Sequence, residues 1–185
     1  MIEIRQAEEL STWANSLHMQ TLYAERARKI QPEMTCTEQA VNLFTSQIDI
    51  SSPSILDVGC GSAWLYHSLK RHYKKDFTYY GIDSDRKFVN IARSIMPEYG
   101  LNASNIFDAE ISHIQGKVDS IFCLNTITYL ANWHSALHTF ASLEPQLIIL
   151  RESLHYAPTN YLYVEDKFID KPNVYTYINT YSISE

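Results

Sequence analysis

The sequence predicts a doubly wound α/β fold with a mostly parallel sheet, formed by one domain over residues 1–185. Short apolar runs alternate along the chain with segments of helical periodicity, which is the order of elements that such a fold requires. Acidic or amide residues close four of these runs, namely Asp57, Asp83, Asp108 and Asn125. Because the carboxyl ends of parallel strands meet at one edge of a sheet, we expect these four side chains to line one ligand site.

The composition is that of a globular protein and limits the classes of partner. Apolar residues make up 45% of the chain and charged residues 19%, the net charge is −6, and basic residues form no long cluster, so nucleic acid is not an expected partner. The three cysteines are widely spaced and odd in number, which indicates reduced thiols and a cytoplasmic location. No apolar run reaches the length of a membrane span, so a membrane partner is not expected either.

The N-terminal region, residues 1–50, is predicted to be helical. Residues 6–30 place four apolar positions on one helical face, Leu10, Trp13, Ala14 and Leu17. A second helix is predicted to start at the capping-box signature of residues 35–38, with Ala40, Val41 and Phe44 on its buried face. We expect these helices to precede a core formed by residues 51–153 and a tail formed by residues 154–185.

The first strand of the core leads into a turn with two glycines. The apolar run Ile55–Val58 carries Asp57 near its end and is followed by Gly59 and Gly61, after which a helix begins. Glycine accepts positive φ and lets a ligand approach the backbone, and the free N–H groups at a helix start favour a negative group. Asp57 is placed to face a positive group, so the turn predicts a ligand that carries both signs of charge.

A second carboxylate follows the next strand. The run of residues 77–82 ends at Asp83, after which Ser84 is placed to cap a helix that buries Phe88, Ile91, Ala92 and Ile95. Asp83 lies about 20 residues beyond the glycine turn, at the position where a carboxylate binds both hydroxyls of a ribose. We expect Asp83→Ala to weaken nucleoside binding and to leave the stability of the ligand-free protein unchanged.

The residue after the glycine turn separates two classes of nucleoside cofactor. The dinucleotide fingerprint G-x-G-x-x-G requires a third glycine where this chain has Trp64, which disfavours an NAD-dependent oxidoreductase. The stretch Leu-Asp-Val-Gly-Cys-Gly-Ser at residues 56–62 instead resembles the first motif of class I S-adenosylmethionine-dependent methyltransferases. That family usually has a further glycine next, at the position of Ala63.

The resemblance covers about residues 35–153 and implies S-adenosylmethionine as the cofactor, a Rossmann-like methyltransferase fold and the strand order 3-2-1-4-5. It also implies that the N-terminal helices form a lid from which Tyr23 touches the cofactor, that Asp108 accepts a hydrogen bond from the adenine amino group, and that the Ala109 N–H donates to the adenine ring. The cofactor-binding residues expected are Asp57, Gly59, Cys60, Gly61, Trp64, Asp83, Ser84, Asp108, Ala109, Leu124, Asn125 and Tyr23.

The remaining core runs predict strands over residues 105–107, 118–125 and 146–150, with a helix around residues 133–140. The loop of residues 125–129 follows the fourth strand, which in the resembled family faces the transferred methyl group. It lacks the Asn/Asp-Pro-Pro-Tyr motif of enzymes that methylate amino groups of nucleic-acid bases, which argues against such substrates. Weak catalytic candidates near it are Asn125, Tyr129, Glu152 and His155. His134 and His138 have helical spacing without a further ligand, so no metal is expected.

The tail holds six tyrosines and is predicted to cover the substrate side of the sheet, with packing against the N-terminal helices as the alternative. The resembled family usually follows its fifth strand with a helix and two more strands, but only 35 residues follow Leu150 here, so we expect an incomplete C-terminal end. A capping-box signature at residues 182–185 would start a further helix. The apolar edge of residues 147–150 is expected to be shielded by the tail or by a second copy in a homodimer.

The function that the resemblance implies is transfer of the S-adenosylmethionine methyl group to a small-molecule acceptor. No residue pattern identifies the acceptor or its reacting atom. An alternative is a catalytically silent module that binds S-adenosylmethionine and regulates a partner.

Overall fold

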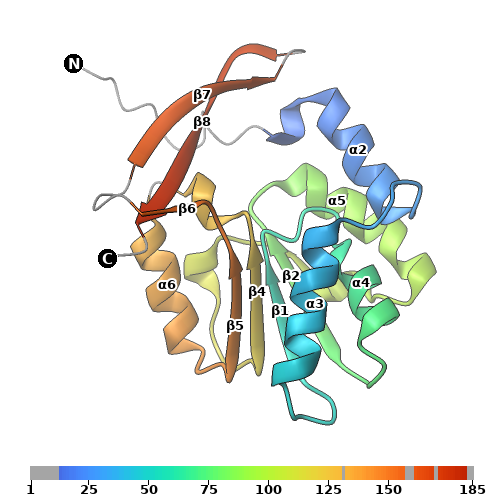
Figure 1. Ribbon diagram of the computed structural model, residues 1–185. Coiled ribbons are helices and arrows are strands. Elements are labelled where there is room, and N and C mark those ends of the chain that lie inside the picture. The colour runs from blue at the N-terminus through green and yellow to red at the C-terminus, as the bar shows by residue number, and fades with distance from the viewer. Residues whose placement is uncertain (1–12, 131, 157–160, 169–170, 183–185) are drawn as a thin grey trace.

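The computed structural model describes residues 13–130, 132–156, 161–168 and 171–182. Its centre is a parallel five-stranded sheet of order β3-β2-β1-β4-β5, which confirms the predicted fold class and the strand order that the resemblance implied (Figure 1). The strands are β1 (Ser54–Val58), β2 (Thr78–Asp83), β3 (Ile106–Asp108), β4 (Ser120–Leu124) and β5 (Leu147–Arg151). Each lies within one or two residues of its predicted run, because a buried parallel strand is apolar along nearly its whole length.

Helices cover both faces of this sheet. Alternate strand residues point to opposite faces. One face, which includes Ile55 and Phe122, packs in one cluster with α3 (Thr35–Gln47), α4 (Leu65–His72) and α5 (Arg86–Ile95). The other, which includes Leu56 and Ile121, packs with α6 (Trp133–Ser142). Short 3-10 helices lie in the connections: η2 (Met96–Tyr99), η3 (Ala103–Asn105), η4 (Ile111–His113) and η5 (Ile127–Tyr129). None of the described helices has the length and apolar character to cross a membrane.

The prediction of one helix over residues 6–30 was wrong for the described part of that segment. A 3-10 turn, η1 (Trp13–Asn15), is followed by α2 (Leu17–Ala27). Ser16 separates them, because its hydroxyl accepts the Met19 N–H at 3.3 Å and caps α2. Leu17 is 70% exposed, so the predicted apolar face is not the buried one; α2 buries Met19 and Ala27 instead. Leu10 lies outside the described residues.

Two of the predicted helix caps also differ from the structure. The helix α3 begins at Thr35 without a side-chain cap, and the hydroxyl of Thr37 donates to the Met34 carbonyl at 2.8 Å. The helix α5 is capped by Asp85, whose side chain accepts the Lys87 N–H at 3.1 Å, and not by the preceding Ser84. Ser and Asp both favour the cap position, so two such residues side by side leave the cap ambiguous in the sequence.

The tail forms a second sheet of its own. Its strands β6 (Leu154–His155), β7 (Tyr161–Phe168) and β8 (Lys171–Ser182) have the order β6-β8-β7, with an antiparallel β7–β8 hairpin. The prediction that no seven-stranded sheet forms is thus confirmed for the described residues, although the tail is mostly strand and not loop. Ser182 ends β8, and residues 183–185 of the predicted capping box lie outside the description. Figure 1 shows the hairpin and α2 at the same end of the central sheet.

The outer edge of β5 is not covered by the described tail. No strand pairs with it there, because β8 reaches the chain only beyond β5, where the Tyr181 N–H donates to the Ser153 carbonyl at 2.9 Å. Ile148 and Leu150 are 39% and 45% exposed. The expected shielding by the tail is therefore wrong for the described residues, and shielding by a second copy stays a prediction.

Candidate functional site

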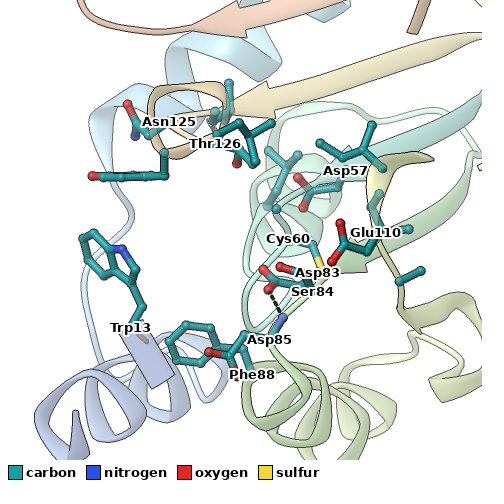
Figure 2. Close-up of a pocket in the computed structure, with 18 of the residues that line it drawn as sticks. Trp13, Asp57, Cys60, Asp83, Ser84, Asp85, Phe88, Glu110, Asn125 and Thr126 are labelled. Carbon is teal, nitrogen blue, oxygen red and sulfur yellow. Dashed lines mark hydrogen bonds between the residues drawn. The ribbon is translucent and has the colours of Figure 1, made fainter. Parts of the chain in front are cut away.

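A cavity of about 1060 Å³ opens where the strands β1, β2, β4 and β5 end, and residues of η1 and α2 close its far side (Figure 2). Many of the predicted site residues line it: Tyr23, Asp57, Gly59, Cys60, Trp64, Asp83, Ser84, Ala109, Leu124, Asn125 and Tyr129. Three do not, namely Gly61, Asp108 and Glu152. The volume of the cavity lies just above the ~300–1,000 Å³ typical of ligand sites, so the cavity has room for a cofactor and a second molecule.

The glycine turn has the predicted backbone, but its glycines are required by the protein's own side chains. Gly59 and Gly61 have φ of +71° and +54°. A Cβ on Gly59 would lie 2.0 Å from Oγ1 of Thr126, and a Cβ on Gly61 would lie 2.3 Å from Cε1 of Tyr23. We expected a ligand to need this space; in the structure, side chains from the loop after β4 and from α2 already occupy it. Ala63, where the resembled family has glycine, also has positive φ, at 60°.

The N–H groups of this turn are mostly used within the protein, contrary to the expectation of a free helix start. Those of Gly59 and Cys60 both donate to the Ile82 carbonyl at 2.9 Å, and that of Gly61 donates to the Asp83 carboxylate at 2.8 Å. The turn is therefore held against the end of β2. A negative ligand group needs another partner, and Arg26 is a cation that lines the same cavity.

Arg26 is a pocket residue that the sequence reasoning missed. Its guanidinium lies 5.2 Å from the ring centre of Tyr23 and 5.4 Å from that of Trp64. Tyr23 stacks in turn on Phe88, with ring centroids 4.1 Å apart, and burial raises the pKa of Tyr23 to about 12. Since Arg26 follows Tyr23 by three residues, one turn of helix, the spacing itself could have indicated that the two share a face.

Carboxylates gather at one end of the cavity. Burial raises the pKa of Asp57 to about 7, although its carboxylate accepts a hydrogen bond from the Tyr79 hydroxyl at 2.5 Å. Burial likewise raises the pKa of Asp83 to about 6, against the N–H groups of Gly61 and Asp85 that donate to it at 2.8 Å. Figure 2 shows Asp57, Asp83 and Glu110 on one side of the open space. This end suits a ligand that is cationic or that donates hydrogen bonds.

The residues after β3 differ from the expectation for an adenine site. The Asp108 carboxylate pairs with the Arg86 guanidinium at 2.6 Å instead of lining the cavity. The Ala109 N–H donates to the Asp83 carbonyl at 3.1 Å, so it is not available to a ligand ring. Glu110, two residues further, lines the cavity in place of Asp108. The carboxylate that lines the cavity after β3 therefore belongs to Glu110 and not to the expected Asp108.

The fourth and fifth strands end side by side at the other end of the cavity. Asn125 follows β4 in a left-handed conformation, φ 59°, which asparagine tolerates better than most residues. Its N–H donates to the Arg151 carbonyl at 2.8 Å, and its side-chain oxygen accepts a hydrogen bond from the Arg151 guanidinium. Tyr129, in η5, packs edge to face on Trp13 of η1, with ring centroids 5.1 Å apart. An amide, a guanidinium and two aromatic rings thus form this end.

Glu152 has a positioning role in this structure and not that of a base at the cavity. Its carboxylate accepts the N–H groups of Ile127 and Thr128 at 3.1 and 3.0 Å and the Thr128 hydroxyl at 2.6 Å. The tail holds the same loop from its other side, since the Asn179 amide donates to the carbonyls of Thr128 and Leu130 at 2.9 and 2.7 Å. The side chain of His155 lies outside the described residues.

Comparison with known proteins shows what this chain is similar to. Residues 56–143 match the family described as a methyltransferase domain. Magnesium protoporphyrin IX methyltransferase of Synechocystis PCC 6803, solved with bound S-adenosylmethionine, superposes with a TM-score of 0.59 at 15% identity, over 97% of both chains. S-adenosylmethionine-dependent methyltransferases of Clostridium acetobutylicum and Aquifex aeolicus give TM-scores of 0.54 and 0.53 at 15% and 17% identity. They cover 88% and 85% of this chain and 81% and 98% of theirs.

These likenesses establish the fold at low identity. No curated protein sequence matches the chain. The chain spans less than two thirds of the length of several structures that it resembles, with 42%, 66% and 50% in three of them.

Proposed function

We propose that this chain is a class I S-adenosylmethionine-dependent methyltransferase, which binds S-adenosylmethionine in the cavity at the carboxyl edge of its sheet and transfers the methyl group to a small-molecule acceptor. The observation that carries the proposal is the acidic end of that cavity, formed by Asp57, Asp83 and Glu110 beside the glycine turn. The cofactor has a sulfonium and an ammonium group against one carboxylate. A site rich in carboxylates therefore favours it over the negatively charged pyrophosphate of a dinucleotide.

Each part of the cofactor has a matching group in this order of strands. Asp83, at the end of β2, is assigned to the ribose hydroxyls, and Asp57, at the end of β1, to the ammonium group. The methionine carboxylate is assigned to Arg26, because the N–H groups of Gly59, Cys60 and Gly61 already donate within the protein. Tyr23 lies on Gly61 and is assigned to the lid above the cofactor. With these assignments, we expect the methyl group to point toward Asn125 and Tyr129.

When bound, S-adenosylmethionine supplies the methyl group: a lone pair of the acceptor bonds to the methyl carbon as the carbon–sulfur bond breaks, and the electron pair stays on sulfur. The chain itself contributes position and exclusion of water. The rings of Trp13 and Tyr129 wall the acceptor end, and the loop after β4 is fixed by Glu152 and Asn179. Among the described residues assigned here, none serves as a general base, so the acceptor is expected to be nucleophilic once bound.

Calorimetry with S-adenosylmethionine, S-adenosylhomocysteine and NAD tests the cofactor. The proposal expects 1:1 binding of the first two and no binding of NAD; binding of NAD alone would overturn it. Transfer of a labelled methyl group from S-adenosylmethionine to a metabolite extract then tests catalysis. Cofactor binding without transfer to any compound would instead assign the chain to the silent regulatory modules.

A further inference from the structure

The three arginines that line the cavity differ in how their charge is used. Arg86 is paired with Asp108, and Arg26 lies over the rings of Tyr23 and Trp64 beside the glycine turn. Arg151 forms no ion pair within the described part of the chain, where its side chain donates to the neutral amide of Asn125. A guanidinium has five N–H donors, and among the described residues only the Asn125 side chain accepts a hydrogen bond from that of Arg151, which leaves donors for a ligand.

Arg151 is also held in place. It ends β5 opposite Leu124 of β4, its carbonyl accepts the Asn125 N–H at 2.8 Å, and its guanidinium donates to the side-chain oxygen of the same asparagine. Backbone and side chain are therefore tied to one residue, the one at which the proposed function places the methyl group. An exposed arginine fixed in this way loses little conformational freedom when it binds an anion.

The charges of the cavity follow the order of the strands. Carboxylates lie at the ends of β1 and β2 and after β3, at Asp57, Asp83 and Glu110. An amide follows β4, and the guanidinium of Arg151 follows β5. The cofactor at the acidic end is a cation, so the far end is the place where a negative charge is stabilised both by Arg151 and by the sulfonium. The rings of Trp13 and Tyr129 form an aromatic wall on the same side.

From this arrangement we infer that the methyl acceptor is an aromatic carboxylate, with its carboxylate on Arg151 and its ring against Trp13 and Tyr129. A guanidinium binds a carboxylate in a planar, two-pronged geometry. A carboxylate is favoured over a phosphate because several carboxylates line the same cavity and would repel a dianion more strongly. This inference rests on the proposed function and specifies its substrate class.

The test measures binding of a matched pair of probes, 3-phenylpropionate and 3-phenylpropionamide, to the protein saturated with S-adenosylhomocysteine, by NMR titration at millimolar concentration. The first step, titration of S-adenosylhomocysteine alone, tests the proposed function: no binding there rejects the cofactor and not the acceptor class. With the cofactor product bound, the carboxylate is expected to bind about tenfold or more tightly than the amide, the scale of one charge-assisted hydrogen bond.

Arg151→Gln is expected to reduce that preference to less than about twofold while keeping the affinity for S-adenosylhomocysteine within about threefold. Arg71→Gln removes the same charge from an exposed arginine outside the cavity, paired with Glu33, and is expected to keep the full preference. Arg151→Lys keeps the positive charge but loses the planar guanidinium, so its preference for the carboxylate over the amide is expected to lie between those of Arg151→Gln and Arg71→Gln. Equal binding of both probes, binding of neither, or a preference that survives Arg151→Gln overturns the inference.

Discussion

Gly59→Ala is expected to destabilise the ligand-free protein by about 2–5 kcal/mol. Positive φ at an alanine costs about 1–2 kcal/mol, and Gly59 has φ +71°. The new Cβ would also lie 2.0 Å from Oγ1 and 2.7 Å from Cγ2 of Thr126, and overpacking of this kind adds about 1–3 kcal/mol. In a domain of this length, 1 kcal/mol corresponds to a shift in melting temperature of about 2–4 °C. The loss is expected without any cofactor, because the overlap is with the protein itself.

Gly116→Ala is the matched control for this prediction. Gly116 has φ +107°, and a Cβ added there meets no heavy atom within 4 Å, so its substitution reports backbone strain alone. Thermal melts of both variants therefore separate strain from overlap. Thr126→Ala removes the two closest atoms and is expected to recover about 1–3 kcal/mol in the Gly59→Ala background. If Gly59→Ala melts no lower than Gly116→Ala, or if Thr126→Ala recovers nothing, the reasoning is refuted.

Three further predictions concern the carboxylates and the tail. Asp83→Asn is expected to weaken S-adenosylmethionine binding by about 10–100-fold in calorimetry, the scale of hydrogen bonds to a charged group; an unchanged dissociation constant would remove Asp83 from the ribose site. Because burial raises the pKa of Asp57 to about 7, its stabilising contribution is full below about pH 4 and is lost as the pH rises to about 7. Wild type should therefore lose melting temperature relative to Asp57→Asn between pH 5 and pH 8, and a constant difference would contradict this. Asn179→Ala removes two N–H donors to the loop after β4, so it is expected to lower the free energy of unfolding by about 1–3 kcal/mol and to speed amide hydrogen exchange in residues 127–130. Unchanged exchange there would show that Asn179 does not hold the loop.

The sequence was sufficient for the central sheet and for the strand ends that carry the site. Buried parallel strands are nearly continuous apolar runs, so their positions and the residues that close them could be read directly. Asp57, Asp83 and Asn125 all lie at the cavity for this reason. Arg151 closes the fifth run in the same way, so the same rule would have found it.

What could not be predicted depends on contacts between distant parts of the chain. The Asp83 carboxylate also holds the N–H groups of Gly61 and Asp85, so the expectation that its removal leaves ligand-free stability unchanged no longer follows. The Ala109 N–H is taken up by the Asp83 carbonyl through the pairing of β2 with β3. Asn179 reaches the loop after β4 across about 50 residues of sequence, and no local pattern marks such a contact.

The prediction of the helix boundaries was wrong for a different reason. Ser16 interrupts the expected N-terminal helix because its hydroxyl caps α2. Apolar residues with helical spacing lie on both sides of it, so their periodicity does not reveal which hydroxyl acts as the cap. Asp85 and Ser84 present the same ambiguity one residue apart.

A crystal structure with S-adenosylhomocysteine tests the central claim most directly, because the claim is about where each part of the cofactor lies. We predict ribose hydroxyls on the Asp83 carboxylate, the methionine carboxylate beside Arg26, and the sulfur directed toward Asn125 with open space beyond it leading to Arg151. A nucleoside bound in the reverse direction, with its ribose at Arg151 and its amino acid group at Asp83, would contradict the account, as would a ligand bound outside this cavity.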